Sequence, residues 1–429
     1  MNEGANPAME NGAVWKDLFI HGSYSTIVLK SLPLVETDSE AARWFLRIFT
    51  VFTNLFLLDD EAVAALSEYA ERGNRFALFG YGRYQMCVKP DPDSMDKAKS
   101  AMLKADSLGL PEATASLGQM HFYGDFGLVD REKAVSYIGA ALTKGCDYAA
   151  ELQLKNIIFG LHGFNADPQK ALDMISSLIA NDILNIGAGN ENPMWHYLKG
   201  CALQQLRGLQ AAKDSYIKAA SMGVVSAWTD VAVSSSHNDD CELVDADGYA
   251  RILDKGIKRG DVFCLYLTAV SRMEEYERMD GMQKKIESEK LLAALESACS
   301  KGSSFAAETL GDIYWFGDYG VAEDNAKAWQ WYAKGALMYS PECYEKMWGM
   351  VHDHYIDKDE AFKDMLALQG ARAGSKKLLG ETVMAYTYGR LTEFAAEIER
   401  YYEPVFDAED AESTDGEVPD DDGRFDAYV

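Results

Sequence analysis

The feature that most constrains the fold of this chain is a pattern that recurs along it. Two segments, 109–145 and 302–340, both read G-x3-A-x3-L-G, then G-D-aromatic-G, then an aspartate, Lys-Ala and an aromatic residue. In both segments the first glycine, the alanine and the leucine are each four residues apart. The same motif at the same spacing indicates an internal repeat, the signature of a chain built from stacked units.

Fainter copies keep the same spacing, which is marked by a glycine at the start of each unit. These frame glycines are Gly73, Gly109, Gly145, Gly223, Gly260, Gly302 and Gly374, separated by 36, 36, 78, 37, 42 and 72 residues. The separations of 78 and 72 correspond to two units each. In one faint copy Trp348 and Gly349 stand where Leu-Gly is expected. The frame predicts about eight units over residues 73–374.

Each unit has the sequence of two helices joined by a tight loop. Gly311 directly follows Leu310 and leaves room for a close helix–helix approach. The G-D-aromatic-G loops supply glycines where the chain must turn through positive φ. Asp130 and Asp324 stand where they can cap the second helix. One such hairpin cannot bury its apolar face alone, so the units are expected to stack.

These motifs resemble the Sel1-like repeat family, a relative of the tetratricopeptide repeats, over roughly residues 73–374. A stretch at 192–221 is closer to a tetratricopeptide unit. The resemblance implies an all-α fold, a right-handed α-solenoid of stacked helical hairpins, and a non-enzymatic role as a scaffold or adaptor that binds proteins. Some Sel1-like families staple each repeat with regularly spaced cysteine pairs. The seven cysteines here lack that spacing and form no C-x-x-C, which favours a reducing compartment.

The ends of the chain differ from the repeats. We expect a disordered N-terminus at 1–13, capping helices at 14–72, C-terminal capping helices at 375–404 and an acidic disordered tail at 405–429. The apolar run at 44–58 is predicted to be a buried helix that Asp38 or Ser39 caps. The longest repeat carries a polar insertion, 273–290, which should extend beyond the regular outline.

Charge limits the choice of partner. The net charge is −27. Residues 403–429 contribute −10, from 11 acids and one base, which leaves −17 on the body. Such a body repels phosphate backbones, so nucleic acid is not expected as a partner. We see no signal peptide, and the most apolar run is too short to span a bilayer. The chain is therefore predicted to be cytoplasmic and to have no membrane contact.

No motif for catalysis is present, whether a P-loop, a dinucleotide fingerprint, H-E-x-x-H or G-x-S-x-G. His352 and His354 are two residues apart and would point to different sides of a helix, which disfavours a shared metal. His352 and His121 are interpreted as core residues, and Cys264 as a small core residue. No catalytic residue, metal, cofactor or small-molecule substrate is predicted.

A binding surface is the better hypothesis, because in related folds the first helix of each hairpin lines a concave groove. Counted from Leu-Gly, the groove positions lie five and two before the leucine and two and five after it. The predicted partner-binding residues are Phe122, Gln119, Tyr197, Phe263, Tyr266, Met273, Phe305, Glu308, Asp312 and Trp315. Aromatic residues among acids suit a protein partner with apolar and basic segments.

A second hypothesis remains open, an acidic inhibitor or immunity-type protein that blocks a basic partner by mimicking a polyanion. Binding through aromatic side chains should survive moderate salt, whereas charge mimicry should not.

Overall fold

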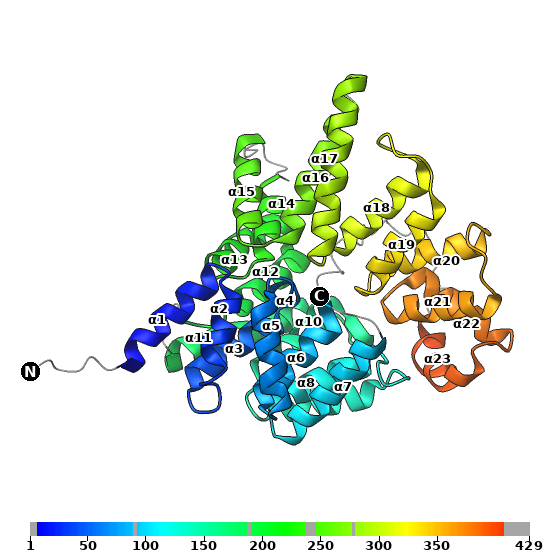
Figure 1. Ribbon diagram of the computed structural model, residues 1–429. Helices are drawn as coiled ribbons and strands as arrows, with labels where there is room; N and C mark the ends of the chain where they lie inside the picture. Colours follow the sequence, from blue (N-terminus) through cyan, green and yellow to red (C-terminus); the bar gives the residue numbers. More distant parts are fainter. Residues whose placement is uncertain (1–6, 89–91, 187–189, 237–245, 277–278, 407–429) are drawn as a thin grey trace, which may run out of the picture. The chain divides into compact units, whose positions relative to one another are not determined.

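The computed structural model describes residues 7–88, 92–186, 190–236, 246–276 and 279–406, and every regular element in these ranges is helical (Figure 1). The elements are α1 (Pro7–Ile20), α2 (Tyr24–Ser31), α3 (Ser39–Thr50), α4 (Phe52–Leu55), α5 (Asp60–Glu71), α6 (Arg75–Val88), α7 (Pro92–Ser107), α8 (Pro111–Phe122), α9 (Arg131–Leu142), α10 (Asp147–Phe159), η1 (Leu161–Gly163), α11 (Pro168–Ile186), α12 (Pro193–Arg207), α13 (Leu209–Ser221), α14 (Ala227–Ser236), α15 (Ala246–Lys258), α16 (Val262–Tyr276), α17 (Gly281–Ser300), α18 (Ser304–Phe316), α19 (Asn325–Ala336), α20 (Pro341–His352), α21 (Glu360–Arg372), α22 (Lys376–Thr387), η2 (Thr392–Phe394) and α23 (Ala395–Tyr401).

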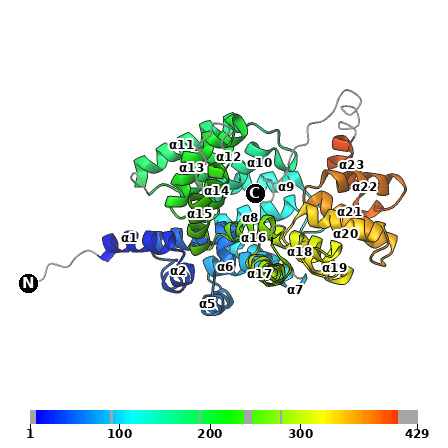
Figure 2. The same ribbon diagram turned by 90° about the horizontal axis from the view of Figure 1, so that it is seen from above.

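From α6 onward the helices form hairpins, in which an even-numbered helix (A) is followed by an odd-numbered helix (B). The chain packs into two compact units. The first unit holds residues up to 119 together with 135–268, and the second holds 120–134 together with the chain from 269 onward. Within the second unit, α18 to α23 follow one another side by side in chain order (Figures 1 and 2).

The frame glycines share one backbone conformation. All seven frame glycines have positive φ, between +73° and +106°, a conformation that L-residues rarely adopt. Each lies in the turn that leads into an A helix. The predicted two-unit gap between Gly302 and Gly374 is divided by Tyr339, a non-glycine residue with φ of 61°. Units therefore start at positions 302, 339 and 374.

Glycines inside the helices make room for large side chains. A Cβ on Gly311 of α18 would overlap the ring of Tyr332, which lies on α19 of the same hairpin. Gly200 of α12 accommodates the ring of Tyr216 on α13 in the same way. The close approach predicted at Gly311 is therefore real, but a tyrosine ring fills it.

A second set of glycines lies on the B helices and meets the next hairpin. A Cβ on Gly256 would overlap Cys264, and one on Gly335 would overlap Cys343. Both cysteines are fully buried. The interpretation of Cys264 as a small core residue is confirmed, and its contact with Gly256 explains why the residue must be small.

The predicted helix starts are also confirmed. Asp130 Oδ1 accepts the backbone N–H of Lys133 at 2.9 Å, and Asp324 Oδ1 accepts that of Lys327 at 3.0 Å. Asp38 caps α3 by accepting the backbone N–H of Glu40 at 2.8 Å. These carboxylates satisfy donors that the first turn of a helix leaves open.

The predicted frame is wrong by one residue in α20. Ser340 Oγ accepts the backbone N–H of Cys343 at 3.2 Å, as Ser303 does for Ala306 at 3.2 Å. Counting from these caps, Met347 and Trp348 take the Leu-Gly places, and Gly349 lies one position later. His352 is therefore exposed and stacks on Trp348, with ring centroids 4.7 Å apart, instead of lying in the core. His121 is buried as predicted.

The N-terminal helices pack along the frame turns of several hairpins of the first unit. α1 begins at Pro7, within the segment expected to be disordered. Phe19 of α1 packs against Gly223, and Ile20 accepts a hydrogen bond from Arg259 through its carbonyl oxygen. Leu57 packs against Gly260. This segment thus contacts later hairpins as well as α6.

The insertion and the tail can be placed only in part. α17 has 20 residues, against 12 in α19, and its first turns expose Met282 and Ile286. Figure 1 shows this end of α17 extending past α18, as expected for the inserted segment. Most of the acidic tail, 407–429, lies outside the described residues.

Candidate interaction surface

The structure separates the ten predicted groove residues by exposure. Two are buried, Phe122 (4% exposed) and Tyr197 (9% exposed). The half-buried ones are Gln119, Phe263, Tyr266, Met273, Phe305, Glu308, Asp312 and Trp315. Four of these, Phe305, Glu308, Asp312 and Trp315, lie on α18 in the second unit. The predicted residues of α16 and of α18 are all half-buried, and α18 carries the larger set, with two acids between its aromatic residues.

A row on α18 is defined by these four residues, which follow each other at intervals of three, four and three and so share one helix face. In the middle of the row, Asp312 Oδ1 accepts hydrogen bonds from Tyr332 Oη at 2.6 Å and Lys346 Nζ at 2.8 Å. These bonds fix the Asp312 carboxylate in place. Lys346 comes from α20, so the next hairpin completes the surface.

An aromatic patch, defined as Trp315, Phe316 and Tyr355, lies at the C-terminal end of this row. The Trp315 ring stacks on Phe316, with centroids 5.5 Å apart and planes 7° apart, and meets Tyr355 edge-on at 5.8 Å. Phe316 is 58% exposed and Tyr355 is 51% exposed. Exposed aromatic rings held by one another are typical of sites where binding energy concentrates.

Sequence reasoning missed two members of this patch. Phe316 follows Trp315 directly and was passed over because it falls outside the row. Tyr355 belongs to the loop after α20, and only the folded structure brings it to Trp315. The aromatic residue at 316 just before the G-D-aromatic-G loop was the one available signal.

Acidic side chains accompany the row. Glu308 lies near Glu342 and Glu345 of α20 as well as Asp312. Burial first, and then these neighbouring carboxylates, raise the pKa of Glu308 to about 7, while Lys346 opposes the shift. A nearby cation strongly stabilises the charged form of a carboxyl whose ionisation is otherwise disfavoured. This strip therefore favours a positively charged partner group.

The corresponding row of the first hairpin is occupied by the N-terminal helices. Phe76 and Phe79 of α6 pack edge-on against Phe45 and Phe49 of α3, with ring centroids 6.4 and 6.5 Å apart. Arg83 donates a hydrogen bond from Nε to the carbonyl oxygen of Phe49 at 3.0 Å. The aromatic residues of that row are therefore used for internal packing.

The described residues hold little that resembles a reactive centre. Among the described residues, no group of three or more His, Cys, Asp or Glu side chains is arranged to hold a metal. Burial raises the pKa of the Cys264 and Cys343 thiols, the opposite of what a nucleophilic thiolate requires. No described helix combines the length and apolarity needed to cross a bilayer.

Buried carboxyls give the fold a pH dependence. Burial raises the pKa of Glu151 to about 7, and burial with Asp261 nearby raises that of Asp230 to about 8. A carboxyl whose pKa is higher in the folded state stabilises the fold while protonated, and this contribution is lost as pH rises through the folded pKa. Stability should therefore fall between about pH 6 and pH 9, by about 1 kcal/mol or more.

Urea unfolding at both ends of this range checks the prediction, and the isosteric variant Asp230→Asn should show a flatter profile. A wild-type protein that is more stable at the alkaline end would contradict it.

Comparison with known proteins gives one family match and similar solved structures. The Sel1 repeat family matches residues 111–146 and 304–340. A solved structure of a protective antigen of uropathogenic Escherichia coli, described as displaying an SLR fold, is 16% identical, with 92% of this chain and 88% of that chain covered and a TM-score of 0.35. A Sel1 repeat protein from Oxalobacter formigenes is 20% identical, with 62% of this chain and 98% of that chain covered and a TM-score of 0.39. No curated protein sequence matches the chain.

These features define the class of protein, an all-α solenoid of stacked helical hairpins. They are the hairpins, the turns at the frame glycines, and the two sets of glycine contacts, one within a hairpin and one between successive hairpins. Two of its hairpins, α8–α9 and α18–α19, are Sel1 repeats. Proteins built from Sel1 repeats are generally non-catalytic protein-interaction scaffolds.

Proposed function

We propose that this protein is a non-enzymatic scaffold that holds a protein partner on the α18 row and its aromatic patch. The observation that carries the proposal is the patch itself, where Phe316 and Tyr355 expose more than half of their surface beside Trp315. Keeping large rings in water is unfavourable unless another surface covers them. The partner segment is expected to place apolar side chains on these rings.

The acidic side chains along and beside the row indicate the charge of the residues that flank the apolar segment of the partner. Glu308 and Asp312 lie within one turn of each other, and Glu342 comes from the next hairpin. Among the described residues with the largest effect on the pKa of Glu308, Lys346 is the one base. Lysine or arginine residues flanking the apolar segment of the partner would complement this strip.

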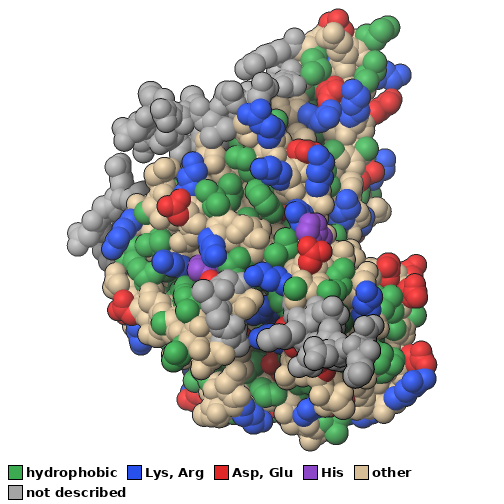
Figure 3. Space-filling model, turned by 90° about the vertical axis from the view of Figure 1, so that its left-hand side faces the viewer, with side chains coloured by type: hydrophobic (Ala, Val, Ile, Leu, Met, Phe, Trp, Pro, Cys, Tyr) green, Lys and Arg blue, Asp and Glu red, His purple; other side chains and the backbone are tan. Residues whose placement is uncertain are grey.

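The alternative, an acidic inhibitor that mimics a polyanion, needs a dense and continuous acidic surface. On the face shown in Figure 3, lysine and arginine side chains are interspersed with hydrophobic and acidic ones. This mixture disfavours charge mimicry on that face.

Removing the exposed rings should abolish most of the partner affinity. The double variant Phe316→Ala/Tyr355→Ala is expected to weaken binding by about 1–3 kcal/mol, because exposed aromatic side chains at an interface centre contribute that much. Both rings are more than half exposed, so the melting temperature should hardly change.

The partner can be obtained by placing a photo-crosslinking amino acid at position 316 in the full-length protein and irradiating a native extract. Its affinity for the variants is then measured directly. Tyr388→Ala, which removes another exposed aromatic ring of the same unit, is the matched control. If this control and the double variant bind equally well, the patch is not the partner site.

A further inference from the structure

A cavity of about 520 Å³ is lined entirely by residues of the first unit. Its floor is formed by α3, and its walls by the first turns of α6, α8 and α10, with Asn192 just before α12. The volume falls within the range of about 300–1,000 Å³ found for sites that bind small groups. The charged residues that line it are Glu36, Asp38, Arg43, Arg47, Arg75, Glu112, Asp147 and Glu151.

One wall carries three carboxyls, Glu112 of α8 and Asp147 and Glu151 of α10. Among the described residues none of the three forms an ion pair within 4 Å. Asn192 donates hydrogen bonds from Nδ2 to Glu151 at 3.0 Å and to Asp147 at 3.4 Å. Glu151 is 3% exposed, and within the described part of the chain its second oxygen has no hydrogen-bond partner.

Three arginines also line the cavity, Arg43 and Arg47 of α3 and Arg75 of α6, and two of them are already paired with other carboxylates. Arg43 is paired with Glu40 at 3.0 Å, and Arg75 is paired with Glu36 at 3.2 Å. Arg47 alone remains without an ion pair among the described residues, with its guanidinium over the Trp44 ring at 4.7 Å. These three carboxyls and Asp38, which also forms no ion pair within the described part of the chain, therefore share the cavity with one such guanidinium.

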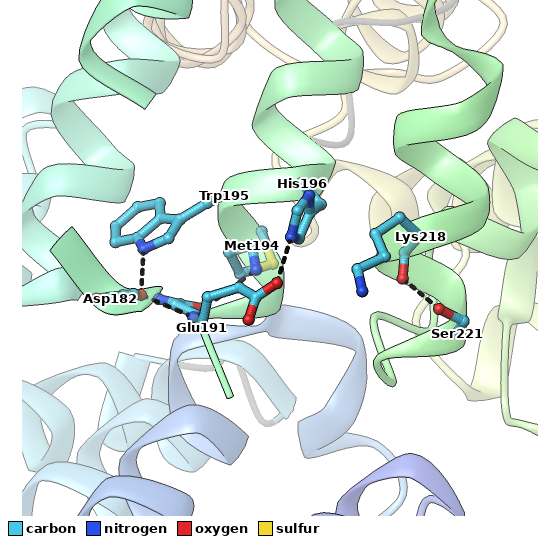
Figure 4. Close-up of polar contacts among 8 residues, drawn as sticks. Asp182, Glu191, Met194, Trp195, His196, Lys218 and Ser221 are labelled. Carbon is cyan, nitrogen blue, oxygen red and sulfur yellow. Dashed lines mark hydrogen bonds and ion pairs between the residues drawn. The ribbon is translucent and has the colours of Figure 1, made fainter. Parts of the chain in front are cut away.

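Asn192 is held in place by a network between α11 and α12 (Figure 4). Asp182 accepts the backbone N–H of Asn192 at 2.9 Å and the indole N–H of Trp195 at 3.0 Å. Trp195 is fully buried. Asn192 Oδ1 also caps α12 by accepting the backbone N–H of Met194 at 3.1 Å. The carboxyl wall is therefore a fixed surface.

We infer that this cavity binds a cationic side chain, lysine or arginine, presented by the protein partner. The inference rests on the proposed function only in taking the partner to be a protein with basic segments. A cation here would reach the carboxyl oxygens left without an ion pair and add to the partial compensation that Arg47 and Lys155 give at longer range. The planar guanidinium of arginine could contact two carboxyls at once.

The raised pKa values of these carboxyls also make their protonation sensitive to a bound cation. Burial raises the pKa of Glu112 and Asp147, and raises that of Glu151 to about 7. A bound cation lowers these pKa values, so binding should release protons near neutral pH and strengthen as pH rises. The other charged groups that face these carboxyls are Glu36, Asp38, Arg43, Arg47, Arg75, Lys155 and Asp182.

Small probes test the cavity without the partner. Calorimetry on the full chain compares N-acetyl-L-arginine amide with N-acetyl-L-norleucine amide, which is uncharged. The arginine probe is expected to bind and release protons, whereas the norleucine probe is not. The triple variant Glu112→Gln/Asp147→Asn/Glu151→Gln keeps the shape and should weaken binding by about tenfold or more. Glu61→Gln, an exposed acid on α5, is the control and should bind as the wild type does.

Three results would overturn the inference. These are equal binding of the two probes, undiminished binding by a folded triple variant, and no binding of the arginine probe at all. The two proposals fail separately, because Phe316→Ala/Tyr355→Ala removes the aromatic patch and leaves every cavity residue intact. Loss of probe binding in that double variant would also contradict a site confined to the cavity.

Discussion

Replacing Gly311 with leucine is expected to destabilise the second unit by about 2 kcal/mol or more. A single Cβ at this position already overlaps the ring of Tyr332. That ring is fully buried and its hydroxyl is fixed by Asp312 at 2.6 Å, so it has nowhere to move. The larger side chain must therefore separate α18 from α19.

The same chain offers a matched control at Gly349, which also lies inside an A helix. A Cβ there would meet nothing within 4 Å. Gly349→Ala should therefore stabilise the protein by about 0.5–1 kcal/mol, the usual gain when alanine replaces glycine in a helix. Chemical denaturation of both variants measures the two effects. Equal stability of Gly311→Leu and the wild type would refute the assigned packing.

Replacing Glu397 with alanine is expected to cost about 3–5 kcal/mol, because it leaves a buried arginine without its counter-ion. Glu397 is 1% exposed. It accepts hydrogen bonds from Arg372 Nε at 2.9 Å and Nη2 at 2.7 Å, and from Tyr402 Oη at 2.8 Å. It also accepts the backbone N–H of Val129 at 3.2 Å, so one carboxylate joins the C-terminal helices to the loop at 124–130.

An exposed pair nearby serves as the comparison. Arg400 and Glu132 form an ion pair in which both side chains are more than half exposed. Surface pairs of this kind contribute about 0–1 kcal/mol, so Glu132→Ala should be nearly neutral. If Glu397→Ala proved as mild as Glu132→Ala in urea unfolding, the buried network would not be holding these segments together.

The parts of the fold that sequence predicts well are local. Asp130 and Asp324 could be assigned as caps because a cap depends only on the residues of the next turn. The frame glycines could be assigned because positive φ restricts the residue type. Tyr339 shows the limit, since a tyrosine at the same position in the same conformation leaves no signal in the sequence.

The parts that sequence could not predict depend on distant contacts. The frame error in α20 arose because Trp348-Gly349 mimics Leu-Gly, and only the Ser340 cap reveals the true register. The packing of α3 on α6 buries Phe76 and Phe79, and no spacing within the repeat indicates that contact. Tyr355 joins Trp315 from another hairpin, so no spacing within one repeat could have found the patch.

The central claim is that an aromatic patch with neighbouring acids binds a protein partner. It is tested most directly by the affinity of the partner crosslinked at position 316, measured at low and at about 0.15 M salt. We predict that wild-type binding persists at the higher salt and that Phe316→Ala/Tyr355→Ala weakens it by about tenfold to a hundredfold at both salt concentrations. Binding that disappears in salt and is indifferent to the double variant would contradict the claim and favour charge mimicry.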